Sequence, residues 1–510
     1  MKLHHIALAV LTAVAGHAAQ AAPSVNVNDA ATVKIYLSGA SALRAAVAGI
    51  MLNDICGGSA ANATTTLYNV AESGSGFSFG GNYWGITCRL PAAKLGLAAN
   101  TPVAFFKSDN GGSAQGVFPV FYQTARPFVD AAPANCTTTT TVDRVYTGCT
   151  NNTLAIPQFG VSDVEPGLFK GANVPKDPLD ADDDNYPEAG LAANELSQLT
   201  RTPILQTVFA VAVNDALYAA MFAKQNLAAK FSSTGAACTT ASTDENCMPT
   251  IGYAEARTFF LGNATNWRLL VSSSDTKLNS QVNVCRRVDG SGTQAAANAV
   301  LLGVGCLPTA TDPAGYTSST SAAPEAVSPL TSRTESGLTM AQYLNANMGG
   351  ALPAAMPSGT VFVFEGPGTG DVVSCLKRAQ DGGGYAIGHV SRENAPGSNL
   401  WRHVKLEGAA PSRDNLIVGR YDYAVESTMQ YKTSYFNTLS AAQKSFITGF
   451  IAEIRKPDAL AKLSSSNQQG VAALPSAYTG SFDARTGNNA IFGSRVTRNG
   501  NSCVPFRATK

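Results

Sequence analysis

Short apolar runs with the spacing of β-strands recur along the chain, and several are followed by a segment with helical spacing. In the first unit, Val33, Ile35 and Leu37 fall on one strand face, and an alanine-rich helix then begins, with Ser41 as a suitable N-cap. Further strands are predicted at residues 102–108, 158–163, 207–214, 282–288 and 385–391. Helices are predicted at residues 215–231, 293–302 and 440–455. This alternation predicts an α/β fold with largely parallel sheets.

Length and composition narrow the class of protein. The chain has 510 residues, of which 45% are hydrophobic and 14% charged. It is therefore long enough for a large folded core, and two α/β lobes fit it better than one sheet. The low charge content argues against a disordered polyelectrolyte and against a nucleic-acid-binding protein with a broad basic face.

The N-terminal residues have the pattern of an export signal. Lys2 precedes a short apolar stretch that ends in the small-residue site Ala19-Gln20-Ala21, which predicts a signal peptide over residues 1–21. The stretch is too short for a membrane span and no lipobox follows, so we expect a soluble periplasmic or extracellular protein. Without Lys2 the chain has equal numbers of acidic and basic residues, and any anion binding must be local.

Ten cysteines, all beyond the predicted signal peptide, indicate an oxidising compartment. No Cys-x-x-Cys motif occurs and histidines are few, so we expect no metal site and no cofactor. Pairing of cysteines close in sequence would give Cys56–Cys88, Cys136–Cys149, Cys238–Cys247 and Cys285–Cys306, leaving Cys375 for Cys503.

The segment from Val284 to Gly303 combines features that favour an anion. A predicted strand ends at Arg287, a turn containing Gly290-Ser291-Gly292-Thr293 follows, and a helix then begins. Backbone N–H groups, hydroxyls and a guanidinium at a helix start suit an oxyanion, although an ordinary capped turn has the same residues. The turns 38–41 and 110–113 have similar chemistry and also follow strands, which predicts one cleft with convergent donors.

Asp163 is the acid that stands out, because it directly follows a predicted strand. A carboxylate among anion ligands is unfavourable unless it accepts a proton from the ligand, so it would select a protonated oxyanion over sulfate. The alternative is that Asp163 only caps a helix that starts near Pro166.

Several motifs resemble, in order, those of the phosphate-binding proteins of bacterial ABC uptake systems, across roughly residues 33–425. "FFLGNATNW" is similar to the family's Phe-x-Gly-x-x-Thr-Asn-Trp segment, and "RVDGSGT" to its Arg-x-Asp-Gly-Ser-Gly-Thr motif. "SGASALR", "GGSAQG", "FGVSDVEP" and "GGYAIGHVSREN" resemble its first loop, second loop, Ser-Asp turn and Gly-Ala-Ile-Gly strand. The resemblance implies a two-lobed periplasmic-binding-protein-like fold with a ligand cleft between the lobes. Lobe 1 would span residues 24–210, completed by 405–510, and lobe 2 would span 211–404.

The resemblance also implies a ligand set and partners. Contacts to the oxyanion are expected from Ser113, Asp163, Arg287, Ser291, Gly292 and Thr293, to which the first loop adds Ser41 and Arg44. The family has Thr-Phe where this chain has Leu43-Arg44, so Arg44 either contacts the ligand or pairs with Asp163 and weakens proton-based selection. The implied ligand is inorganic phosphate and the implied partner an ABC permease, and we expect a monomer that is not an enzyme.

The sequence leaves two alternative functions and contains one segment that resembles a calcium site. The cysteine-bearing loops, which look like additions to the family core, fit an exported scaffold, adhesion or assembly protein with a vestigial cleft. A phosphate-ester hydrolase is a third possibility, but the sequence shows no activated nucleophile. The acidic stretch 177–184 resembles the start of a calcium loop, yet Asn185 replaces the turn glycine, which favours a solvated loop.

Overall fold

The computed structural model describes residues 25–58, 64–71, 81–140, 144–175, 186–303, 306, 328–329, 361–366, 368–381, 383–396 and 400–509. The predicted signal peptide and the acidic stretch 177–184 lie outside these residues. Over the described ranges, no helix has both the length and the apolar character that a membrane crossing requires.

A mixed sheet of 15 strands organises the described chain. Its main path runs through β13 (Ser328–Pro329), β14 (Val361–Gly366), β12 (Val282–Arg287), β15 (Ala386–Ser391), β10 (Leu199–Asn214), β18 (Ala424–Lys432), β9 (Phe159–Ser162), β1 (Val33–Gly39), β4 (Pro102–Ser108), β3 (Tyr83–Arg89), β2 (Thr66–Asn69), β7 (Val145–Thr147) and β6 (Thr138–Thr140). Two more strands, β16 (Trp401–His403) and β19 (Val471–Ala473), also pair with β10. Three two-stranded sheets are formed by β5 (Arg126–Phe128) with β8 (Thr153–Ala155), β11 (Thr250–Ile251) with β17 (Lys405–Leu406), and β20 (Val496–Thr497) with β21 (Arg507–Ala508).

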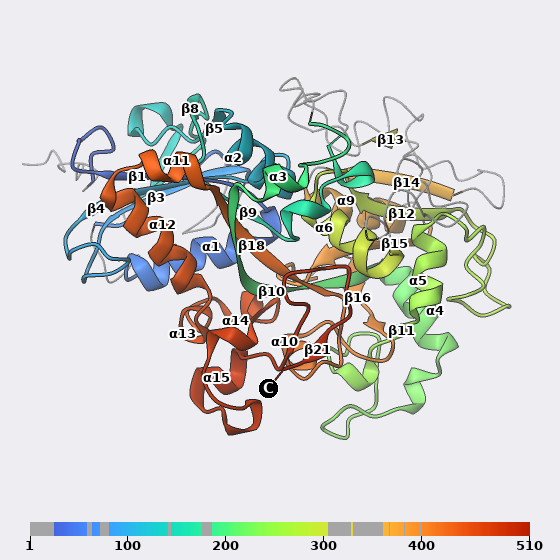
Figure 1. Ribbon diagram of the computed structural model, residues 1–510. Coiled ribbons are helices and arrows are strands. Elements are labelled where there is room, and N and C mark those ends of the chain that lie inside the picture. The colour runs from blue at the N-terminus through green and yellow to red at the C-terminus, as the bar shows by residue number, and fades with distance from the viewer. Residues whose placement is uncertain are drawn as a thin grey trace, which may run out of the picture.

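The long strand β10 connects two portions of this sheet. Residues 199–208 pair with β18, whereas residues 209–213 pair with β15. In Figure 1, β1, β3 and β4 lie on one side of β10 and β18, and β12, β14 and β15 lie on the other. The predicted lobe boundaries at residues 210 and 404 stay a prediction.

The α/β class is as expected, but the sheet is not largely parallel. Every neighbour of β10 runs antiparallel to it, as do β3 to β4 and β2 to β3. Parallel pairing is confined mainly to two groups, β9–β1–β4 and β14–β12–β15. The sequence does not reveal whether these strands pair in parallel or antiparallel, because a strand that is buried on both faces has a similar apolar run in either case. The two parallel groups are the ones that supply the site.

Helices cover the sheet close to where helical spacing predicted them. The predicted helix at 440–455 is α12 (Ala441–Ile454), capped by Ser440, and its Phe450 stacks on Phe105 of β4 with ring centroids 5.4 Å apart. The helix predicted at 215–231 ends earlier, as α4 (Asp215–Lys224), and η7 (Leu227–Ala229) follows. The segment 293–302 forms α6 (Gly292–Ala296) and continues as the π-helical turn η9 (Ala297–Leu302).

The remaining helical segments are short, except for α9. They are η1 (Ser41–Leu43), α1 (Arg44–Gly49), η2 (Ile50–Ile55), η3 (Ser113–Gly116), α2 (Phe118–Tyr122), η4 (Pro133–Asn135), η5 (Pro166–Leu168), η6 (Gly171–Asn173), α3 (Ala193–Leu196), η8 (Glu245–Cys247), α5 (Tyr253–Phe260), α9 (Thr369–Asp381), α10 (Arg413–Ile417), α11 (Thr433–Thr438), α13 (Pro457–Leu460), α14 (Ser465–Gln468), η10 (Pro475–Ala477), η11 (Phe482–Ala484) and α15 (Gly487–Phe492). The expected cap at Ser41 is wrong, since neither η1 nor α1 has a side-chain cap.

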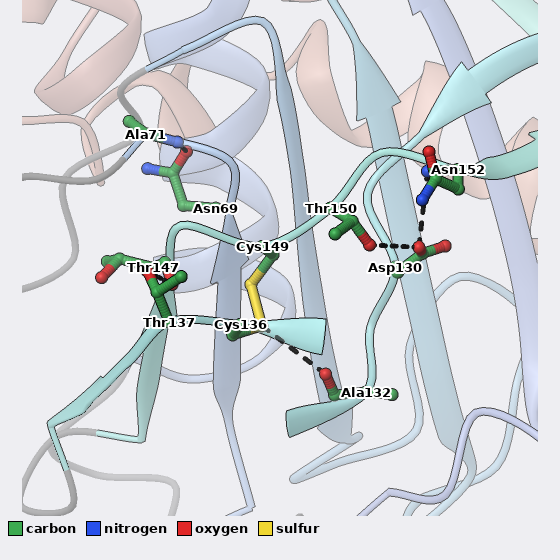
Figure 2. The surroundings of a disulfide bond; sticks show 10 residues. All are labelled: Asn69, Ala71, Asp130, Ala132, Cys136, Thr137, Thr147, Cys149, Thr150 and Asn152. Atoms are coloured by element: carbon green, nitrogen blue, oxygen red, sulfur yellow. Dashed lines mark hydrogen bonds between the residues drawn. A yellow bond between two sulfur atoms is a disulfide. The ribbon is translucent and has the colours of Figure 1, made fainter. Parts of the chain in front are cut away.

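Five disulfides join all ten cysteines. Three of the predicted pairings are confirmed, Cys56–Cys88, Cys136–Cys149 and Cys238–Cys247. Figure 2 shows Cys136–Cys149 beside Asp130, which accepts hydrogen bonds from the Thr150 hydroxyl and the Asn152 backbone.

The other two predicted pairings are wrong, because sequence proximity does not decide them. β12 and α9 pack together and place Cys285 against Cys375, which leaves Cys306 for Cys503 across a sequence separation of 197.

Candidate functional site

Three turns meet at the carboxyl ends of β1, β4 and β9. These strands are parallel neighbours, with Ser38 opposite Ser108 and Gly39 opposite Val161, so the residues that follow them emerge at one edge. Only glycine fits at Gly39, where φ is +110° and a Cβ would lie 2.1 Å from the Val161 carbonyl oxygen. This close packing brings the turn of Ser41, the turn of Ser113 and Asp163 together.

Ser113 and Asp163 hold each other directly. The Ser113 hydroxyl donates to Asp163 Oδ2 at 3.1 Å and accepts from the Asp163 backbone N–H at 3.1 Å. The short helix after Asp163, η5, has Glu165 as its N-cap and no side-chain cap, so the capping role considered for Asp163 is wrong. Asp163 therefore lies inside the site, fixed by a serine from the neighbouring turn.

The glycine-rich turn after β12 packs against these two side chains. A Cβ on Gly292 would lie 2.1 Å from Ser113 Oγ and 2.4 Å from Asp163 Oδ2. The backbone N–H of Ala114 donates to the Gly290 carbonyl oxygen at 3.0 Å, which fixes this approach. Ser291 caps the helix that begins here, and its hydroxyl accepts from the Gln294 N–H at 3.5 Å. Glycine at position 292 is thus required for the contact between the two parallel groups of strands.

Arg287 brings a buried cation to the same place. Its guanidinium donates to the Gly366 carbonyl oxygen at 3.2 Å, to Ser41 Oγ at 3.4 Å and to Thr369 Oγ1 at 3.5 Å. Burial lowers the pKa of Arg287 to about 10, with Asp371 and Asp163 opposing the shift, so the group stays charged at neutral pH. Ser41, which fails as a helix cap, instead meets Arg287 from the opposite side of the site.

Two buried oxygens in this cluster lack a partner within the described chain. They are Asp163 Oδ1 and Thr293 Oγ1, on side chains that are each 1% exposed. Burial raises the pKa of Asp163 to about 6, although the Ser113 hydrogen bond, Arg287 and Lys107 lower it. A carboxylate oxygen and a hydroxyl oxygen next to the contact of Gly292 with Ser113 thus have hydrogen-bonding capacity that the described chain does not use, and the charge of Arg287 is near enough to act on Asp163.

Arg44 forms an ion pair with Asp109. The alternative prediction, that Arg44 pairs with Asp163, is wrong. Arg44 Nε donates to Asp109 Oδ2 at 2.7 Å, and Trp84 Nε1 donates to the same oxygen at 3.0 Å. The buried Lys107 forms an ion pair with the other oxygen of Asp109, and its Nζ also donates to the Gly39 carbonyl oxygen at 2.8 Å. This network lies under the first turn and leaves Asp163 free of Arg44.

Sequence reasoning missed several groups of this site. Lys107 and Asp109 could have been noticed as charges at the end of the apolar run "VAFFKSD". Thr369 and Asp371 come from the start of α9, which no motif indicated. Glu393, in the turn after β15, carries a partly buried carboxyl whose pKa burial raises well above its usual range, while Arg44 opposes the shift.

His389 lies close to the site but contributes no charge. Burial, together with the charges of Arg286 and Arg287, lowers the pKa of His389 to about 3. Its Nε2 lies 3.1 Å from Gln294 Oε1, and because an amide oxygen only accepts, Nε2 is the donor in this hydrogen bond. The imidazole is neutral at physiological pH, so the positive charge that acts on Asp163 comes from Arg287 and Lys107.

The structure therefore brings together most of the residues that the sequence predicted. Ser113, Asp163 and Gly292 contact one another, Arg287 contacts Ser41, and the charge of Arg287 acts on Asp163; Ser291 and Thr293 flank Gly292. Arg44 is adjacent but forms an ion pair with Asp109. Within the described ranges, no group of three or more His, Cys, Asp or Glu side chains is arranged to hold a metal ion.

Comparisons with known proteins give similarity to solved structures alone. No family model matches the sequence, and no curated protein matches it. A phosphate ABC transporter substrate-binding protein of Clostridium perfringens, with bound phosphate, is similar at 13% identity and a TM-score of 0.39, covering 84% of this chain and 97% of that one. An ABC-type phosphate transport receptor of Vibrio cholerae has 11% identity and a TM-score of 0.35, covering 82% and 93%. A phosphate-binding protein of Stenotrophomonas maltophilia has 13% identity and a TM-score of 0.34, covering 83% of this chain and 84% of that one. At these values the similarities do not establish a shared ligand.

Proposed function

We propose that this protein is an exported solute-binding protein that binds inorganic phosphate, or a closely similar protonated oxyanion, between the two parallel groups of strands. The observation that supports this most strongly is the pair of unpartnered buried oxygens, Asp163 Oδ1 and Thr293 Oγ1, beside the buried guanidinium of Arg287. Buried oxygens of this kind normally have hydrogen-bond partners, and a protonated oxyanion would supply partners to both of them while its negative charge meets the guanidinium of Arg287.

The charges of the site favour a protonated oxyanion in particular. Arg287 supplies the cation that the negative oxygens need, and Thr293 supplies a hydroxyl donor. Asp163 repels a bare oxyanion when it is ionised, but it accepts a hydrogen bond from an oxyanion that carries a proton. Phosphate carries such a proton at neutral pH and sulfate does not, so the site should select phosphate and arsenate.

Arg44 does not disturb this selection, because Asp109 holds it away from Asp163. Its Nε contacts the Asp109 carboxylate at 2.7 Å, and Arg44 stays partly exposed. We assign Arg44 to the rim of the site, where it attracts the ligand and balances the carboxyls of Asp109 and Glu393. Delivery of phosphate to an ABC permease, export through the signal peptide and a monomeric state remain predictions that go with this function.

The test is calorimetric titration of the purified protein with phosphate, comparing Arg287→Ala with Arg286→Ala. Arg287 is buried at the site, whereas Arg286, the preceding residue of β12, is partly exposed and points to the other face of the strand. We expect Arg287→Ala to weaken binding by about 3 kcal/mol, on the order of 100-fold, because a buried charge-assisted interaction is lost. Arg286→Ala should change affinity little. Equal losses in both variants, or no phosphate binding by the unaltered protein, would refute the proposal.

A further inference from the structure

The C-terminal segment is anchored beside the strand that leads to Asp163. Glu426 of β18 accepts hydrogen bonds from the backbone N–H groups of Arg498 at 2.7 Å and Gly500 at 2.6 Å. Arg498 Nε donates to the Ala424 carbonyl oxygen at 3.0 Å. Since β18 pairs with the end of β9, with Thr428 opposite Ser162, this segment belongs to the Asp163 side of the site.

Ser502 then holds the turn that carries Asp163. Its backbone N–H donates to Glu165 Oε1 at 2.9 Å, and its hydroxyl donates to Glu165 Oε2 at 2.5 Å. Ser502 is buried, and Glu165 lies two residues beyond Asp163. Both oxygens of Glu165 are therefore committed to a single residue of the C-terminal segment.

The residue after Ser502, Cys503, is linked to the helical segment that begins at Gly292. Cys503 forms a disulfide with Cys306, which lies four residues beyond the end of η9. That helical segment is the continuation of α6, whose first residues are Gly292 and Thr293. Two consecutive residues, 502 and 503, thus connect the turn of Asp163 with the helix of Gly292 and Thr293.

A buried amide contact joins the same two parts of the chain closer to the site. Asn298 Nδ2 of η9 donates to Asn173 Oδ1 at 2.8 Å, and Asn173 Nδ2 donates to the Leu168 carbonyl oxygen at 3.0 Å. Gln294 Nε2 donates to Asn298 Oδ1 at 2.9 Å, which links this contact to the first turns of the helix. The connection through residues 502 and 503 is thus reinforced by a second one.

We propose that Ser502 and Cys503 act as a clasp that limits how far the Asp163 turn and the Gly292 helix can separate, with Glu165 as a positioning residue. The part of this proposal that concerns ligand exchange rests on the proposed function. Because a disulfide cannot lengthen, any opening large enough to exchange a buried ligand must first break the hydrogen bonds between Ser502 and Glu165 or displace the C-terminal segment from β18. The clasp therefore sets the rate of ligand exchange, and opening is restricted to small motions.

Hydrogen exchange of the ligand-free protein tests the clasp without relying on any ligand. The variant is Cys306→Ser/Cys503→Ser, and the matched control is Cys136→Ser/Cys149→Ser. The control disulfide, drawn in Figure 2, joins the residues next to β6 and β7, which are the last strands at one end of the sheet. We expect amides of residues 161–169 and 291–296 to exchange at least about tenfold faster in the first variant and at the unaltered rate in the control. Amides of β3 and β4 should keep their rates in both variants, which separates local opening from global destabilisation. Unchanged exchange at residues 161–169 and 291–296 would overturn the proposal.

Glu165→Ala examines the noncovalent half of the clasp while the disulfide stays intact. It should accelerate exchange in the same two segments, and Glu165→Gln, which can still accept from the N–H of Ser502, should restore slow exchange. When Glu165→Ala is added to Cys306→Ser/Cys503→Ser, the exchange rate in these segments should rise by less than about a further twofold, because both changes break the same connection. Fully additive effects would show two independent local contacts and would contradict the clasp.

Phosphate dissociation, followed by stopped flow, provides the second readout. We expect Cys306→Ser/Cys503→Ser to release phosphate at least about tenfold faster than the unaltered protein. If the unaltered protein binds no phosphate yet hydrogen exchange responds as expected, the proposed function fails and the clasp stands. If phosphate binds but neither its dissociation nor hydrogen exchange changes, the clasp is wrong and the proposed function stands.

Discussion

Replacement of Asp163 by asparagine should stabilise the ligand-free protein in a pH-dependent way. Burial raises the pKa of this carboxyl from 3.8 to about 6. A raised pKa means that the folded protein holds the proton of Asp163 more tightly than the unfolded chain does. The contribution of Asp163 to the free energy of unfolding is therefore fully present below about pH 4 and is lost as the pH rises to about 6. At about 1.4 kcal/mol per pKa unit, the difference corresponds to a loss of about 3 kcal/mol by pH 7, which the neutral asparagine avoids.

Urea unfolding of both proteins without phosphate, from pH 4 to pH 8, measures this effect. All three tryptophans, Trp84, Trp267 and Trp401, are buried, so fluorescence reports unfolding on both sides of the site. The free energy of unfolding of Asp163→Asn should exceed that of the unaltered protein by an amount that grows by about 3 kcal/mol between pH 4 and pH 7. Asp483→Asn, at an exposed aspartate, is the control and should show no such growth. A constant difference for Asp163→Asn would refute the idea that this carboxyl is held against its own ionisation.

Three further predictions concern the surroundings of the site. Gly292→Ala should abolish measurable phosphate binding in calorimetry, because its Cβ would lie 2.1 Å from Ser113 Oγ; retained affinity would show that the turns do not meet as described. Asp109→Asn should lower the free energy of unfolding by about 3 to 5 kcal/mol, because the fully buried Lys107 loses its ionic partner, and a loss below 1 kcal/mol in urea unfolding would contradict this. Peptide mapping of the non-reduced protein by mass spectrometry should find no free thiol and should recover the two long-range disulfides; finding the alternative pairing of neighbouring cysteines would disprove the packing of β12 on α9. These disulfides are Cys285–Cys375 and Cys306–Cys503.

The elements around the site could be predicted because their information is local. The strand predicted at residues 102–108 matches β4, and the turns that follow β1, β4, β9 and β12 contain the glycines and hydroxyls that the motifs indicated. Parallel strands then bring those turns to one edge of the sheet, so that local patterns were sufficient to place Ser113, Asp163 and Gly292 together.

The features that could not be predicted depend on contacts between distant segments. The partner of Arg44 is Asp109, 65 residues away, and neither residue type nor spacing distinguishes it from Asp163. Strand direction was also hidden, because β10 is apolar over most of its length and periodicity carries no direction. The disulfides of Cys306 and Cys375 follow from how β12 packs on α9. Thr369 enters the site from a segment without a recognisable motif. Glu393 lies in the motif of the Gly-Ala-Ile-Gly strand, but nothing in that motif indicated that its carboxyl would be buried near Arg44.

The measurement that tests the central claim most directly is a side-by-side titration of the unaltered protein with phosphate and sulfate near pH 7.5. With Asp163 ionised above a pKa of about 6, an anion without a proton meets an uncompensated buried charge. Phosphate should therefore bind more tightly than sulfate by at least about 3 kcal/mol, more than a hundredfold in dissociation constant. Asp163→Asn should narrow that gap, because an amide can donate to a bare oxygen. Comparable affinities for the two anions in the unaltered protein would contradict selection of a protonated oxyanion by Asp163.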